Sequence, residues 1–277
     1  MKPSSIILFI LSGITAMLTS CTTKSSYETH PLSFATISAG KTYRLKGSAK
    51  ALDHRDDLIF VDSVSLLMPS LVENKDVRYI QDAILKAAFD STAVDHASLI
   101  EDYFEKNARE IGFEAVPSDS SLNYIQADGY EMIRGYLINL TPGLMVYCVS
   151  NYNMMPIAAH GMQTRSYINY SIDTNKVISL SDLFTPEGLS ALPSLIAKRA
   201  EDNVAVNGPT EITALPANGN FYLSPAGEIV FAYQPYEVAS YAQGFINIAF
   251  YPYELINYLT PSAVSYFGLS DIAISSN

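Results

Sequence analysis

Residues 156–184 read PIAAHGMQTRSYINYSIDTNKVISLSDLF and place several chain reversals close together. His160-Gly161 predicts a tight turn, and the alternation over residues 163–171 predicts a strand. Thr174-Asn175 predicts a polar reversal, because Asn tolerates the left-handed backbone that such turns require. Ser181-Asp182 then favours the start of a helix. The stretch therefore predicts strands that are ordered around a histidine-containing bend.

The remainder of the chain continues this mixture of strands and helices. Patterns of β-branched and aromatic residues predict strands at residues 41–48, 58–68, 130–140, 144–154, 177–179, 221–223, 228–233 and 244–250. We expect Pro69 to end the second of these. Apolar residues at helical spacing predict helices that begin near Asp76, Ser98 and Pro186, with a short helical turn from Pro252. The prediction is an α+β fold, mainly antiparallel sheets packed against a few amphipathic helices, in two subdomains at 34–128 and 129–277.

The amino terminus has the layout of an export signal. Residues 1–20 contain one positive residue, Lys2, before an apolar run that is too short for a membrane-spanning helix. Leu18-Thr19-Ser20-Cys21 resembles a bacterial lipobox, which predicts a lipid on Cys21 and a tether over residues 21–33. The alternative is a secreted protein with an incidental cysteine. We expect a lipid-anchored protein of the bacterial cell envelope, at the outer membrane.

Cysteine content limits the covalent chemistry that is available. The chain has two cysteines, so lipidation of Cys21 would leave Cys148 without a partner for an intramolecular disulfide. Cys148 lies in an apolar run, where a buried, inert thiol is expected rather than a nucleophile.

Composition argues against some classes of partner. The 277 residues include 17 Lys and Arg against 28 Asp and Glu, a net charge of −11. Nucleic acid is not an expected partner, because phosphate binding depends on clustered basic residues. A basic protein or a glycan fits this composition better. The sequence contains no HExxH, paired CxxC, Walker or GxSxG string, so we predict no metal site, no cofactor and no catalytic residue.

The order of features around residue 160 resembles domain-of-unknown-function family 3298, which occurs in lysozyme-sensing anti-sigma factors and beside peptidoglycan deacetylase domains. That family usually reads Gly-Gly-Ala-His-Pro, Asn-x-Asp, Thr-Gly-Lys and Leu-x-Asp-Leu-Phe. The counterparts here are Ala158-Ala159-His160-Gly161, Ser171-Ile172-Asp173, Thr174-Asn175-Lys176 and Leu180-Ser181-Asp182-Leu183-Phe184. A second block, from Phe221-Tyr222-Leu223 through Phe231 to Glu237 and on to Tyr241 to Gly244, resembles the family's terminal Tyr-x-Pro-Tyr-Glu segment. Residues 34–128 resemble the strand-then-helix domain, family 4163, that commonly precedes it.

The candidate binding residues come from these matching blocks, and each also has a structural interpretation. His160 could be oriented by an aspartate, or could only fill a turn and bond to a backbone carbonyl. The aspartates could bind a ligand or cap a turn and a helix, and the tyrosines could stack on a ligand or cover the sheet. The candidates are His160, Asp173, Asp182, Tyr233, Tyr236, Glu237 and Tyr241.

The resemblance implies a non-catalytic envelope protein that binds a lysozyme-like protein or a peptidoglycan-type glycan. The alternative is an enzyme that modifies envelope glycan, a hydrolase or deacetylase, with His160 acting beside Asp173 or Asp182. A third possibility is a purely structural lipoprotein in a larger assembly.

Overall fold

The structure is a computed structural model that describes residues 32–45, 58–71, 76–92, 95–111, 113–115, 127–156, 158–201 and 211–271. Two compact units make up the chain: unit 1 contains residues 1–136 and 149–162, and unit 2 contains residues 137–148 and 163–277. The signal peptide, Cys21 and most of the tether lie outside the described residues.

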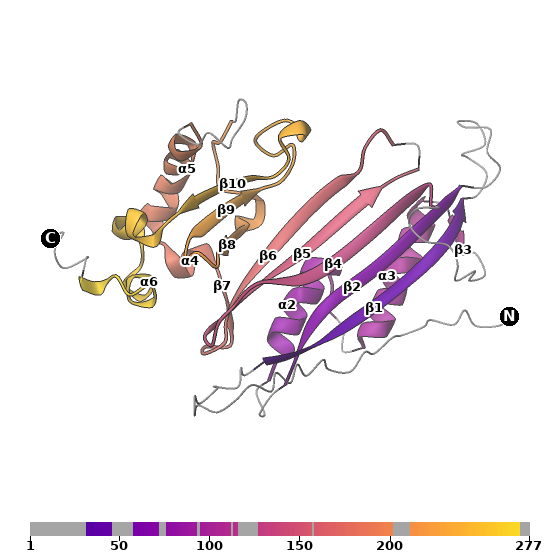
Figure 1. The fold of residues 1–277 in the computed structure, drawn as a ribbon, viewed down its shortest axis with the longest axis horizontal. Coiled ribbons are helices and arrows are strands. Elements are labelled where there is room, and N and C mark those ends of the chain that lie inside the picture. Colours follow the sequence, from indigo (N-terminus) through magenta and orange to yellow (C-terminus); the bar gives the residue numbers. More distant parts are fainter. Residues whose placement is uncertain are drawn as a thin grey trace, which may run out of the picture. The chain divides into compact units, whose positions relative to one another are not determined.

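Unit 1 is built on long strands and two helices (Figure 1). The strands are β1 (Leu32–Leu45), β2 (Ile59–Leu71), β3 (Phe113–Ala115), and parts of β4 (Gly129–Leu140) and β5 (Leu144–Met154). β1 pairs antiparallel with both β2 and β3. β2 pairs parallel with β4, so the chain returns to the sheet in the same direction after its helices.

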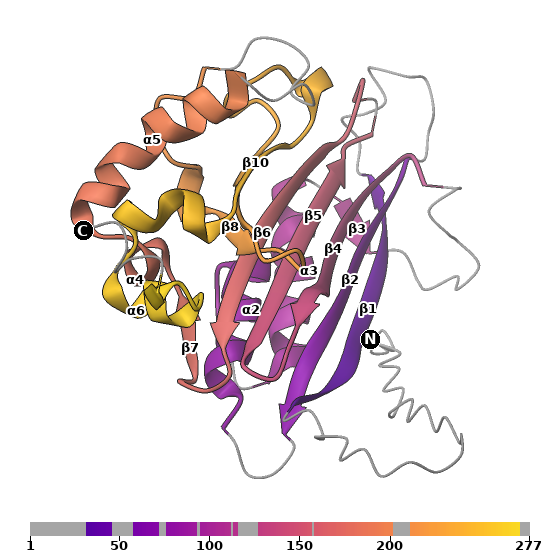
Figure 2. The ribbon, with the colours of Figure 1, turned by 60° about the vertical axis from the view of Figure 1, so that its left-hand side comes forward.

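Helices α2 (Arg78–Phe89) and α3 (His96–Ile111) lie against one face of this sheet (Figure 2). They bury Ile80, Ile84 and Leu85 from α2, and Ile100 and Phe104 from α3. Both helices therefore use the stripe that helical spacing predicts. The Tyr43 hydroxyl donates to the Phe104 carbonyl at 3.0 Å and fixes α3 to β1.

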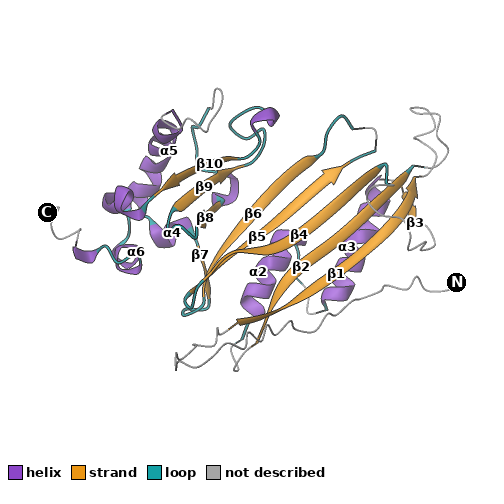
Figure 3. Ribbon diagram, in the orientation of Figure 1, coloured by secondary structure: helices purple, strands orange, loops and turns teal. Residues whose placement is uncertain are grey.

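Unit 2 contains a short sheet with several short helices (Figure 3). Its sheet has the order β10-β9-β8, with all pairs antiparallel. These strands are β8 (Phe221–Leu223), β9 (Ile229–Tyr233) and β10 (Ile246–Phe250). The unit also holds β6 (Met162–Ser171, from Gln163), β7 (Lys176–Ile178), α4 (Leu180–Leu183), α5 (Pro186–Glu201), α6 (Pro261–Tyr266) and the 3-10 helices η2 (Ala217–Gly219), η3 (Tyr241–Gln243) and η4 (Pro252–Tyr258).

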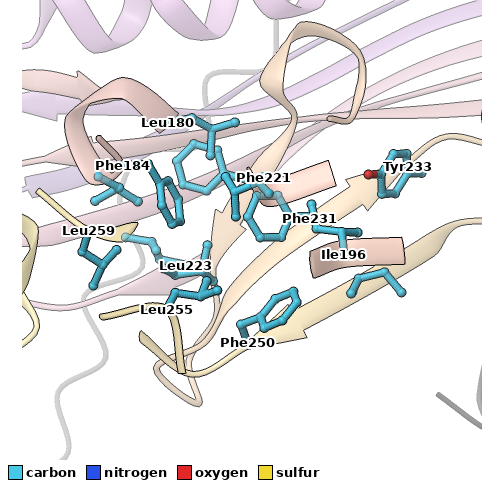
Figure 4. Packing of buried hydrophobic residues seen from close by; sticks show 14 of the residues in the cluster. Leu180, Phe184, Ile196, Phe221, Leu223, Phe231, Tyr233, Phe250, Leu255 and Leu259 are labelled. Atoms are coloured by element: carbon cyan, nitrogen blue, oxygen red, sulfur yellow. The ribbon is translucent and has the colours of Figure 1, made fainter. Parts of the chain in front are cut away.

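The core of unit 2 is aromatic and aliphatic. Phe231 lies at its centre, with ring centroids 6.3 Å from Phe184 and 6.1 Å from Phe250 (Figure 4). Leu223 and Leu255 are buried in the same cluster. Burying side chains of this size contributes about 1.5–3 kcal/mol each, so this core stabilises the surface loops above it.

The α+β fold class is confirmed, and most of the predicted strands are present. The hairpin of β4 and β5 closes at Thr141, whose amide donates to the Leu144 carbonyl at 2.8 Å. The turn between β6 and β7 contains Asn175 at φ 55°, as the turn chemistry predicts. Cys148 is buried, and it forms no disulfide with any of the described residues.

Three predicted boundaries were wrong. β1 begins at Leu32, because residues 32–40 continue the antiparallel pairing with β2 as far as Leu71. Pro69 does not end β2, because it lies beyond the segment that pairs with β4, where no second strand needs its missing amide. α3 begins at His96 rather than near Ser98, because Asp95 accepts hydrogen bonds from the Ala97 amide and the Ser98 hydroxyl.

Candidate functional site

The loop after β9 is held in one conformation by a single carboxylate. Glu237 accepts from the Gln234 amide at 2.7 Å and from the Ala217 amide at 2.6 Å. Its own amide donates to the Gln234 carbonyl at 3.1 Å. Glu237 therefore closes the Gln234-Pro235-Tyr236-Glu237 turn and ties it to the neighbouring η2 segment.

Tyr236 occupies the strained position of this turn. Its φ is 68°, in the left-handed region that costs a non-glycine residue about 1–2 kcal/mol. The residue is nonetheless 57% exposed, so this strained backbone position holds an aromatic residue that is largely open to solvent. Strain of this kind persists where the surroundings over-determine the backbone, and it concentrates at functional positions.

Tyr236 has an aromatic neighbour from the next segment. The ring of Tyr241, at the start of η3, lies 5.4 Å from the Tyr236 ring at an interplanar angle of 32°. The two rings form a surface with apolar faces and polar edges, which suits stacking on sugars or on the side chains of a protein partner. The structure thus brings two of the candidate residues together.

The same loop is fastened to β6 by side-chain amides. The side-chain amide of Gln234 accepts from the Arg165 backbone N–H through Oε1 at 2.9 Å and donates to the Arg165 carbonyl through Nε2 at 2.7 Å. Asn220 donates to the same carbonyl at 3.0 Å and accepts from the Tyr167 amide at 3.1 Å. These amides make the contacts that a neighbouring strand would make, so the loop rests on a rigid base.

Tyr233 lies beneath the loop and not on the surface. It is 1% exposed, and its hydroxyl donates to the Ala214 carbonyl at 2.9 Å. Burial, with a further contribution from Glu237, raises the pKa of the Tyr233 hydroxyl. Its place in the core matches the structural interpretation of this tyrosine.

The two aspartates occupy exposed positions in local structure. Asp182 accepts from the Ser179 amide at 2.7 Å in the capping box that opens α4. Asp173 lies in the turn between β6 and β7, and a Cβ at Gly143 would meet its Oδ2 at 2.9 Å. The Asp182 contacts are those of a helix cap.

His160 belongs to unit 1, whereas every other candidate binding residue belongs to unit 2. Its ring is exposed, and Nδ1 lies 3.1 Å from the carbonyl oxygen of Gly161. Gly161 itself is buried, and a Cβ there would meet the Tyr152 hydroxyl at 2.2 Å. The glycine therefore allows this bend to lie against Tyr152. The family that the sequence resembles usually has proline at this position.

A second polar cluster, not predicted from the sequence, is enclosed in unit 1. Asp62 on β2 is 0% exposed and Glu131 on β4 is 8% exposed, and the two are direct partners in the parallel pairing. Asn107 of α3 donates to both carboxylates, at 3.0 Å to Asp62 Oδ2 and 2.9 Å to Glu131 Oε2. The Tyr103 hydroxyl also donates to Glu131. We refer to Asp62, Glu131, Asn107 and Tyr103 as the carboxylate cluster.

The surroundings of Asp62 in the carboxylate cluster favour the protonated form of its carboxyl group. Burial and, after it, the neighbouring Glu131 together raise the pKa of Asp62 to about 7, against the opposing effects of Asn107 and Lys41. Burial and Glu131 likewise raise the pKa of the Tyr103 hydroxyl.

The alternation of apolar and polar residues along β2 and β4 contained a signal for the carboxylate cluster. Asp62 falls in the buried row of β2 with Phe60 and Val64, and Glu131 falls in the buried row of β4 with Ile133. An acidic residue in an apolar row is a buried polar group that needs partners. Local pattern could therefore have found both residues, although not their pairing.

Among the residues that the structure describes, no group of three or more His, Cys, Asp or Glu side chains could hold a metal ion. Within the same residues, no helix combines the length and apolar character needed to cross a bilayer.

Comparison with known proteins adds a family assignment for one segment. Residues 181–258 match the family model described as "Protein of unknown function (DUF3298)". This match covers less than a third of the 277 residues, so it describes that segment and not the whole chain. The DUF3298 segment includes Asp182, Tyr233, Tyr236, Glu237 and Tyr241, but not His160 or Asp173.

Solved structures resemble this one over most of its length. A DUF3298 family member from Bacteroides fragilis aligns with a TM-score of 0.64 at 19% identity, over 86% of this chain and 96% of that one. A DUF3298 family protein from Pseudomonas aeruginosa aligns with a TM-score of 0.52 at 16% identity, over 83% and 96% of the two chains. At these identities the likeness establishes the fold alone. No curated protein matches the sequence significantly. The resemblance of residues 34–128 to family 4163 stays a prediction.

Proposed function

We propose that this protein is a non-catalytic, lipid-anchored binding protein of the bacterial cell envelope, and that the Tyr236–Tyr241 surface contacts its ligand. The ligand is a lysozyme-like protein or a peptidoglycan-type glycan. The anchor rests on the sequence around Cys21, and an outer-membrane location on the same export pattern.

The observation that carries the proposal is the exposed, strained Tyr236. A largely exposed ring, on a turn fixed by Glu237 and Gln234, has the properties of a pre-organised contact residue. Loops that present binding residues from a rigid base are a common arrangement in recognition. The net charge of −11 supports attraction to a basic protein partner.

Calorimetric titration of the purified protein with lysozyme and with muramyl fragments tests this proposal. We expect saturable binding of at least one of them. Tyr236→Ala should weaken that binding about tenfold or more, because aromatic contacts at the centre of an interface often carry this share of affinity. Tyr79→Ala is a matched control, since Tyr79 on α2 is 50% exposed and lies in unit 1.

Two outcomes would count against the proposal. One is the absence of heat with both lysozyme and the muramyl fragments. The other is equal loss of affinity in Tyr236→Ala and Tyr79→Ala, which would place the binding surface elsewhere.

A further inference from the structure

Arg165 is a half-buried arginine with a rigidly held backbone. It lies on β6, and both its N–H and its carbonyl are bonded to Gln234, with Asn220 as a second donor to the carbonyl. Gln234 comes two residues before Tyr236, so Arg165 supports the same loop that presents the tyrosine pair. These hydrogen bonds therefore fix the backbone position from which the Arg165 side chain extends.

Aromatic groups hold the guanidinium in place. Its Cζ lies 4.1 Å from the centroid of the Phe245 ring, within the range of a cation–π contact. A side-chain hydrogen bond joins it to Tyr167, and burial is the main cause that raises the pKa of Tyr167 to about 12, against the lowering effect of this hydrogen bond. Nε is buried and has no hydrogen-bond partner among the described residues. Because this atom is enclosed by protein, a ligand can reach only the exposed part of the half-buried side chain.

Arg165 also differs from Arg78 and Arg199 of this acidic chain. Arg78 pairs with Asp76, and Arg199 pairs with Glu254. Within the described ranges, no carboxylate forms an ion pair with Arg165. Partial burial of an unpaired cation is costly, whereas a planar guanidinium is well suited to bind a carboxylate through two parallel hydrogen bonds.

We propose that Arg165 binds a carboxylate of the ligand, so that the loop recognises an acidic sugar in preference to a neutral one. This inference rests on the proposed function, because it names the ligand class for the same part of unit 2. A single arginine matches one carboxylate, while the overall charge of −11 opposes ligands that carry many negative charges. The aromatic rings supply apolar faces for the sugar ring.

N-acetylmuramic acid and N-acetylglucosamine provide a matched pair of probes, since the first carries a lactyl carboxylate that the second lacks. Titration is followed by NMR on the Nε–H resonance of Arg165 in the full chain. We expect N-acetylmuramic acid to shift this resonance in a saturable way and to bind at least about tenfold more tightly than N-acetylglucosamine.

Variants separate charge from structure. Arg165→Gln should weaken N-acetylmuramic acid binding about tenfold or more and leave N-acetylglucosamine binding unchanged, whereas Arg165→Lys should lose less. For these variants, ligand-induced shifts of the backbone amides report binding. Arg134→Gln, an exposed arginine of unit 1, is the control and should bind as the parent does.

Equal affinity for the two sugars, or an Arg165→Gln variant that keeps the preference, would overturn the inference. If both sugars bind equally and Tyr236→Ala removes both, the Tyr236–Tyr241 surface stands and only the role of Arg165 fails. If neither sugar binds, the inference fails, and the lysozyme titration decides the proposed function separately.

Discussion

Asp62 gives the stability of this protein a pH dependence that is unusual for an aspartate. Its pKa of about 7 in the folded protein lies above the ordinary 3.8, so the folded state binds more protons than the unfolded chain between these values. The free energy of unfolding should therefore be highest on the acid side of this window and fall as pH rises through 7. Each unit of pKa difference corresponds to about 1.4 kcal/mol.

Asp62→Asn removes this titration while it keeps the shape of the side chain. Denaturant unfolding at pH 5 and pH 8 should show that the stability of the variant relative to the parent grows by about 3 kcal/mol between these two pH values, because about two units of the titration window lie above pH 5. Asp90→Asn serves as the control, because Asp90 is exposed and its left-handed backbone suits asparagine. A difference between Asp62→Asn and the parent that stays constant from pH 5 to pH 8 would contradict the argument.

The sequence pattern predicted the burial of single side chains better than it predicted contacts between residues that are far apart in the sequence. The buried rows of β2 and β4 are visible as alternation around Asp62 and Glu131, and the exposure of Tyr236 agrees with its place in a Pro-containing loop. The sequence could not show that Asp62 and Glu131 are partners, because parallel pairing joins segments separated by two helices. The strain at Tyr236 likewise depends on bonds from Glu237 to distant Ala217.

Among the elements, α5 and η4 approach each other at one glycine. A Cβ on Gly188 would meet the Tyr258 carbonyl oxygen at 2.4 Å, and the Thr185 amide already donates to that oxygen at 2.9 Å. We expect Gly188→Ala to destabilise the protein by about 1–3 kcal/mol, although alanine is the better helix former by about 1 kcal/mol. The backbone oxygen cannot move aside without breaking the Thr185 bond.

The midpoint of denaturant unfolding measures this effect. Ser194→Ala, at an exposed position of the same helix, should be neutral or slightly stabilising and controls for helix propensity. A Gly188→Ala variant as stable as Ser194→Ala would show that the two elements can separate at little cost.

The bounds of helices and strands were predicted correctly where turn and cap residues determine them. They were missed where strand pairing or a choice between two caps determines them. Turn residues such as Asn175, and Pro186 at the start of α5, placed their elements correctly. The start of α3 was missed because Asp95 and Ser98 are both suitable caps, and only the structure shows that Asp95 caps the helix. The early part of β1 has weak alternation, and its strand conformation comes from pairing with β2.

At the scale of the whole molecule, the chain divides into two compact units that do not follow a single boundary in the sequence. Residues 149–162 belong to unit 1 although residues 137–148 belong to unit 2. A linear reading of composition cannot detect this, because a long strand such as β5 contributes to both units. Assignment of residues to units depends on contacts between distant segments.

Cys148 offers a probe of stability at this same scale. It is 0% exposed in the central run of β5, where the six residues from Leu144 to Val149 are all buried. A thiol reagent reaches it only after opening of the surrounding core, so labelling should be about a thousandfold or more slower in native buffer than in denaturant. The labelling rate should rise with denaturant in parallel with global unfolding, because the neighbours of Cys148 in β5 are buried as well. A Cys148→Ala variant gives the background rate, and fast labelling of the native protein would show that β5 opens without unfolding of the core.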